Sequence, residues 1–162
     1  MRIRFQLSGH LVLVALLLCL CLATLMRSRA STTVRAAGTA SLTVHVIGAR
    51  NGKGMIRVAV FRDPKGFPNT ASEAVQTQAV AIDPQTLSAK IVFTNLPEGI
   101  YAVSVFHDEN MNRKLDKNFM GIPKEGYGAS NNPKKKMGPP SFEETKFQLS
   151  GTLQVLEIKL MY

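Results

Sequence analysis

The stretch from His107 to Gly121, HDENMNRKLDKNFMG, holds the densest set of side chains able to do chemistry. Its oxygen-bearing side chains fall at relative positions one, three, five and nine, and these are Asp108, Asn110, Asn112 and Asp116. This spacing is typical of a calcium loop, in which alternate side chains turn inward around a hard cation. Lys114 would supply its backbone carbonyl at position seven. The pattern therefore predicts a calcium site in this loop.

Two departures weaken the calcium pattern. The sixth position, normally Gly for a sharp turn, is Arg113, and the twelfth, normally a bidentate Glu, is Phe119. Glu125 is a candidate distal carboxylate, although nothing in the sequence places it, and Lys114 and Lys117 add positive charge nearby. Any such site is expected to be weak, with a dissociation constant of ~10⁻⁴–10⁻³ M. The alternative is a series of Asx turns, in which Asp and Asn side chains bond their own backbone.

His107 ends a predicted strand beside Asp108. It is a candidate metal ligand or general base, and the alternative is a strand-end histidine held by a neighbouring carboxylate. A hydrolase would need His107 and Asp108 to converge with Glu125 in one pocket. No serine lies in a nucleophile-elbow context, and both cysteines fall in the N-terminal apolar run. The sequence therefore favours a non-catalytic binding module over an enzyme.

Tyr127 lies between two glycines in the stretch from Gly121 to Asn132, GIPKEGYGASNN. An aromatic ring in this setting could stack on a sugar or on a partner's side chain, or it could fold back over the edge of the domain. The predicted binding surface comprises His107, Glu125 and Tyr127. The expected ligand is a protein or a polysaccharide of the envelope or the extracellular space. Calcium is the one cofactor that the sequence suggests.

The N-terminal 37 residues have the layout of a signal peptide. Arg2 and Arg4 precede an almost unbroken apolar run over residues 11–26, and small residues follow it. At 16 residues the run is slightly short of the roughly 20 that span a bilayer. Arg27 and Arg29 after the run favour the alternative, an uncleaved membrane anchor over residues 7–26 serving an envelope-tethered structural protein. We therefore expect export to the periplasm, the cell surface or the medium, with membrane contact only through this segment.

The net charge of +9 comes largely from this N-terminal segment. It carries five arginines and no acidic residue, which leaves 15 basic and 11 acidic residues in the rest of the chain. No basic helix or aromatic-interleaved stripe accompanies that mild excess, so we expect no nucleic-acid binding.

Residues 38–162 are predicted to form one all-β domain. Leu42, Val44 and Val46 alternate with more polar neighbours, and the segment 55–61 is a second strand that we expect to form a hairpin with the first. Five further strands are predicted over 75–82, 87–93, 101–106, 144–149 and 153–160, with Leu153, Val155 and Ile158 as core positions. Seven short strands favour a β-sandwich, immunoglobulin-like or transthyretin-like, with a long loop over 107–141.

The run LPEGIYAVSVFHDENMNRKLDKNFMGIPKEGYGASNN, followed by GPPSFEETKF, resembles the bacterial family called domain of unknown function 2141. The resemblance implies an exported protein with a small β-sandwich and adds no established activity. The family often carries Gly where this chain has Arg113, so the departure bears on the cation site. The segment LPEGIYAVSV is also similar to the turn and strand of carboxypeptidase-regulatory and transthyretin-like sandwiches, which is an analogy of fold only.

Overall fold

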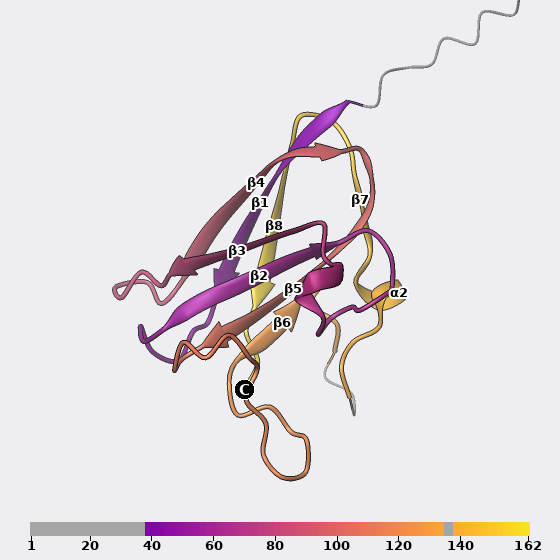
Figure 1. Ribbon diagram of the computed structural model, residues 1–162. Coiled ribbons are helices and arrows are strands. Elements are labelled where there is room, and N and C mark those ends of the chain that lie inside the picture. Colours follow the sequence, from indigo (N-terminus) through magenta and orange to yellow (C-terminus); the bar gives the residue numbers. More distant parts are fainter. Residues whose placement is uncertain (1–37, 135–137) are drawn as a thin grey trace, which may run out of the picture. The chain divides into compact units, whose positions relative to one another are not determined.

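The computed structural model describes residues 38–134 and 138–162, so the predicted signal peptide or anchor over 1–37 lies outside the described residues. The described chain is all-β, with eight strands in two sheets and only two short helical turns (Figure 1). No helix in these two ranges is long and apolar enough to cross a membrane.

The first sheet has three strands in the order β4-β1-β8, and their bounds are β4 Ala89–Pro97, β1 Thr39–Ile47 and β8 Leu153–Lys159. The second sheet has the order β3-β2-β5-β6, and β7 also pairs with β5. Its strands are β3 Gln76–Ala81, β2 Met55–Phe61, β5 Gly99–Asp108, β6 Tyr127–Ala129 and β7 Phe147–Leu149. All neighbours are antiparallel except β1 and β8, which run parallel.

Alternating side chains of both sheets meet in one hydrophobic core. Leu42 and Val44 on β1 are 0% exposed, and they share this core with Val58 on β2 and Val103 on β5. Because successive side chains in a strand point to opposite faces, every second residue of these strands enters the core. The predicted alternation of β1, β2 and β5 is therefore confirmed.

Three predictions about strands are wrong. β1 and β2 form no hairpin, since β1 pairs with β4 and β8 while β2 pairs with β3 and β5. Leu153 and Val155 are 61% and 62% exposed, because the parallel register on β1 turns the other face of β8, with Ile158, toward the core. The predicted strand 144–149 begins as a helical turn, α2 Phe142–Thr145, and only its end forms β7. β6 also interrupts the predicted loop 107–141.

The face of the second sheet that points away from the core is partly covered by a small aromatic cluster. Phe61 and Phe67 meet edge to face at 5.2 Å, and Phe67 meets Phe142 at 5.8 Å. Phe142 is positioned by α2, whose first turn is closed by a capping box between Ser141 and Glu144. This cluster places the segments around residues 68 and 140 beside the outer face of β5, where they border the site.

Candidate functional site

The long loop, residues 109–126, connects β5 to β6 and lies below these two strands in the view of Figure 1. Within it, the Oδ1 atoms of Asn110 and Asn112 accept hydrogen bonds from the backbone N–H groups of Asn112 and Lys114, at 3.1 and 2.8 Å. Their Nδ2 groups donate to the two carboxylate oxygens of Asp116, at 2.8 and 3.0 Å. The structure thus brings together three of the four side chains singled out by spacing, in the Asx turns named as the alternative to a cation.

Asp108 faces a different set of partners. It is 0% exposed, and its Oδ2 accepts a hydrogen bond from the backbone N–H of Arg113 at 3.0 Å and pairs with Nε of Arg57. Its Oδ1 is buried and has no hydrogen-bond partner among the described residues. Within residues 38–134 and 138–162, no group of three or more His, Cys, Asp or Glu side chains is placed to hold a metal. Calcium binding stays a prediction.

The chain makes the sharp turn at the sixth loop position without a glycine. Arg113 has φ of 65° and Met111 has φ of 60°, both in the left-handed region. This conformation costs a residue with a side chain of order 1 kcal/mol or more. The turn directs the Arg113 N–H to the Asp108 carboxylate. The presence of Arg instead of Gly at this position therefore leaves the backbone path of the turn in place and adds conformational strain.

Glu125 fastens the base of the long loop. It is 4% exposed; Oε1 accepts a hydrogen bond from Glu109 N–H at 2.9 Å, and Oε2 accepts one from Asp116 N–H at 3.0 Å. One carboxylate therefore ties the beginning of the Asx turns to their end. A surface role was predicted for this residue, but its burial shows that it holds the loop from inside.

His107 was also expected on the binding surface, and it too is buried, at 0% exposure. Its Nε2 lies 2.7 Å from the carbonyl oxygen of Lys53, which can only accept, so Nε2 carries the proton. Its Nδ1 lies 2.8 Å from the hydroxyl of Tyr162, which accepts from the Arg50 N–H at 2.9 Å. Burial raises the pKa of the Tyr162 hydroxyl above its ordinary value, so the hydroxyl keeps its proton at neutral pH.

Tyr162 is a part of the site that sequence reasoning missed. Its ring closes over Gly126, where an added Cβ would lie 2.5 Å from the ring carbon Cζ. A side chain at position 126 would therefore have to displace the Tyr162 ring. No local pattern marks a terminal tyrosine as a partner of a histidine far away in the chain, so the sequence held no signal for this contact.

Glu109 pairs with the β1–β2 connection. Its carboxylate lies 2.6 Å from Nη2 of Arg50 and accepts a hydrogen bond from Asn51 Nδ2 at 3.0 Å. Burial raises the pKa of this carboxyl, but the bonds from Asn51 and Arg50 and the charge of Arg50 outweigh it. The pKa of Glu109 therefore lies below its ordinary value of 4.5.

The side chains that a hydrolase would need do not converge. His107 shares the core-facing side of β5 with Val103 and Val105, whereas Asp108, the next residue in the strand, faces the opposite side and pairs with Arg57. Both imidazole nitrogens of His107 already have partners, and the Glu125 carboxylate is occupied by two backbone amides.

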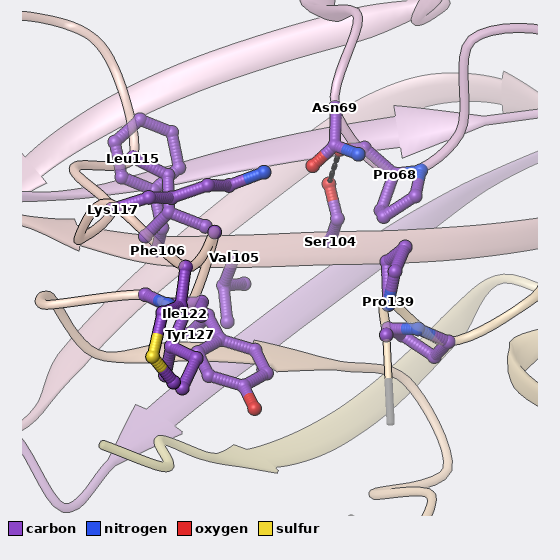
Figure 2. A pocket seen from close by; sticks show the side chains of 16 residues that line it. Pro68, Asn69, Ser104, Val105, Phe106, Leu115, Lys117, Ile122, Tyr127 and Pro139 are labelled. Atoms are coloured by element: carbon purple, nitrogen blue, oxygen red, sulfur yellow. Dashed lines mark hydrogen bonds between the residues drawn. The ribbon is translucent and has the colours of Figure 1, made fainter. Parts of the chain in front are cut away.

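A cavity of about 520 Å³ opens on the outer face of β5 and β6. Figure 2 shows Lys117, Ile122 and Tyr127 on one side of it and Pro68 and Pro139 on the other. Its lining is predominantly apolar, and the polar side chain of Ser104 donates to the carbonyl oxygen of Pro68 at 3.0 Å. The half-buried Tyr127 is therefore the one residue of the predicted binding surface that lines a cavity.

The cavity joins the long loop to the rest of the domain. Residues 115, 117 and 120–123 of the loop form one wall, while residues 68–69 and 138–140 form another. The floor comes from β5 and β6, with Phe106 and Tyr127 paired across the two strands. The spacing argument had identified the loop, but not the two proline-containing segments that complete the cavity.

A family model described as "Uncharacterized protein conserved in bacteria (DUF2141)" matches residues 44–156. The match covers both sheets, the long loop and the segments around the cavity. No curated protein and no solved structure matches the chain.

Proposed function

Because the chain belongs to the family of uncharacterized proteins conserved in bacteria (DUF2141), its function has to be argued from its own site, and we propose a non-catalytic binding module. The observation that carries the proposal is the cavity of about 520 Å³ on the outer face of β5 and β6. Its volume falls in the range of about 300–1,000 Å³ typical of small-molecule sites. The ligand would sit between the long loop and the proline segments.

The lining suggests a ligand with an apolar or aromatic body and one anionic group. Phe106 and Tyr127, which pair across β5 and β6, are the aromatic residues of the lining, and prolines close the opposite wall. Lys117 supplies a positive charge and makes no ion pair within the described residues. A polysaccharide, the broader expectation from sequence, would call for more hydroxyl-binding side chains than this cavity offers.

The two sheets around one core support the finer prediction of an immunoglobulin-like or transthyretin-like β-sandwich. Export is part of the same proposal and rests on the basic start and apolar run of residues 1–37. Mass spectrometry of the protein recovered from its host separates two cases. A new N-terminus near residue 31 or 37 supports export with cleavage, while an intact Met1 supports the envelope-tethered structural alternative.

The cavity proposal is tested with anilinonaphthalene sulfonate, a fluorescent probe that joins aromatic rings to one anionic group. We expect saturable binding with one probe per chain. Lys117→Gln should weaken it about tenfold, since a hydrogen bond to a charged group contributes about 1.5–3 kcal/mol. Tyr127→Ala should weaken it further by removing a ring face. The matched control is Lys90→Gln, an exposed lysine on β4 of the other sheet. Equal probe affinity in all four proteins would contradict the proposal.

Calcium is a separate part of the proposal, as an ion that stabilises the loop walling the cavity. Two features support it: the alternating oxygens of Asn110, Asn112 and Asp116, and the buried Oδ1 of Asp108 without a hydrogen-bond partner among the described residues. If it binds, millimolar calcium should raise the unfolding temperature, and Asp108→Asn or Asp116→Asn should abolish the increase. If the wild-type unfolding temperature is the same with calcium and with chelator, the Asx turns act alone.

A further inference from the structure

The tip of the long loop, residues 118–122, exposes a group of large apolar side chains. Phe119 is 98% exposed, Met120 is 64% exposed and Ile122 is 50% exposed. Single exposed apolar residues are normal on a protein surface, but three within four positions of one turn form a contiguous patch. Phe119 takes no part in lining the cavity, so the patch extends beyond the site described above.

Asn118 closes the backbone of the tip on itself. Its Oδ1 accepts hydrogen bonds from the N–H groups of Met120 and Ile122, at 2.9 and 3.0 Å. Its own N–H donates to the carbonyl oxygen of Ile122 at 2.8 Å, and its carbonyl oxygen accepts from the Gly121 N–H at 2.9 Å. Moving a backbone polar group from water into an apolar medium costs free energy unless the group has a hydrogen-bond partner. The four bonds supply such partners and so reduce the free-energy cost of moving the tip out of water.

Exposed basic side chains surround the apolar tip. Lys114 and Lys117 precede it and Lys124 follows it, and none of the three makes an ion pair in the part of the chain that the structure describes. The three acidic residues of the loop bond other groups: Glu109 pairs with Arg50, Asp116 accepts from two Asn amides, and the buried Glu125 accepts from two backbone amides. The tip therefore combines apolar side chains at its end with exposed lysines on both sides of it in the chain.

We propose that this tip docks the domain on a bilayer rich in anionic phospholipid. Phe119, Met120 and Ile122 enter the boundary between headgroups and acyl chains, and the three lysines contact lipid phosphates. A protruding turn of five residues suits insertion into a soft interface better than the flat packing of a protein–protein interface. This membrane contact is separate from the one expected from the sequence, which involves the N-terminal segment.

The test uses the full chain, which contains no tryptophan, so Phe119→Trp introduces a single reporter at the tip. With vesicles of phosphatidylglycerol and phosphatidylcholine in equal parts, its emission should shift to shorter wavelength and be quenched by brominated acyl chains. Vesicles of phosphatidylcholine alone should give neither effect at about 0.1 M salt. The matched control is Val155→Trp. The wild-type Val155 side chain is 62% exposed, but it lies on strand β8 and not on the loop that carries the three lysines. This reporter should remain in water with both vesicles.

A second variant tests the lysines in the reporter protein. Lys114→Gln together with Lys124→Gln leaves the tip and the cavity lining intact and should lower vesicle affinity about thirtyfold. Absence of a spectral shift with either vesicle would overturn the proposal and leave a protein as the partner of this patch. Equal quenching at positions 119 and 155 would also overturn it, since adsorption would then proceed through another part of the chain. Affinity independent of anionic lipid would overturn the role of the lysines.

Discussion

Glu125 joins two backbone amides at the base of the long loop, and we expect Glu125→Gln to loosen that loop. The glutamine keeps one acceptor oxygen and places an NH₂ group opposite the other amide. Glu125 now accepts one bond from Glu109 N–H at 2.9 Å and one from Asp116 N–H at 3.0 Å. In the variant one of these two bonds is lost, and the glutamine NH₂ group faces a backbone N–H, so two donors oppose each other. A hydrogen bond to a charged acceptor contributes about 1.5–3 kcal/mol, so we expect a loss of about 2 kcal/mol.

Hydrogen exchange measured by NMR gives the local readout. A loss of about 2 kcal/mol corresponds to about thirtyfold faster exchange at the amides of Glu109 and Asp116. Where the loop and sheets unfold together, the same loss lowers the unfolding temperature by about 8 °C for a domain of this size. Glu125→Ala should exceed both effects, because it leaves both amides without the carboxylate.

The matched control is Glu143→Gln, which breaks an ion pair with Lys146 in which the Glu143 side chain is 73% exposed. Exposed pairs contribute about 0–1 kcal/mol, so this variant should unfold close to the wild-type temperature. The reasoning is refuted if Glu109 and Asp116 keep wild-type exchange rates in both Glu125 variants. Water would then replace the carboxylate without cost, and Glu125 would not fasten the loop.

Three further predictions follow from the same region. Arg113→Gly should raise the free energy of unfolding, measured in urea, by about 1 kcal/mol, because φ of 65° is unstrained for glycine. A decrease would show that the Arg113 side chain stabilises the fold by more than the strain destabilises it. Tyr162→Phe removes the hydroxyl between His107 Nδ1 and Arg50 N–H and should lower the free energy of unfolding by about 1–2 kcal/mol. An unchanged free energy of unfolding would mean that these hydrogen bonds do not stabilise the fold. The folded-state pKa of Glu109 is depressed, so its contribution is present above the unfolded value near 4.5 and is lost as pH falls through the folded value. Glu109→Gln should therefore reduce the loss of stability on acidification below about pH 4.5, and identical pH profiles for both proteins would contradict the assignment.

The parts predicted correctly are those that depend on neighbours in the chain. The alternation of Leu42, Val44 and Val46 identified a strand and its buried face, because side chains in a strand alternate whatever it pairs with. The Asx turns at Asn110 and Asn112, named as the alternative to a cation, are present, because each Oδ1 bonds an amide two residues ahead. The lack of an apolar period also located the loop that forms one wall of the cavity, although the predicted bounds of 107–141 include β6.

The parts predicted wrongly depend on pairing between distant segments. The β1–β2 connection has turn residues, yet it carries the chain from one sheet to the other instead of closing a hairpin. The face of β8 that enters the core follows from its parallel register on β1, which moves Leu153 and Val155 to the surface. A shift of one residue reverses the two faces of a strand, and an apolar pattern on both faces leaves that choice open.

Local periodicity is enough to predict an all-β domain and a polar loop with alternating oxygens. The places where that loop is fastened, the residues that border the cavity and the side chains that reach water depend on long-range packing. Tyr162 and the proline segments reach the loop from distant parts of the chain, and Glu125 bonds amides 16 and 9 residues before it in the chain. Such contacts depend on how the two sheets associate, and no short stretch of sequence encodes that association.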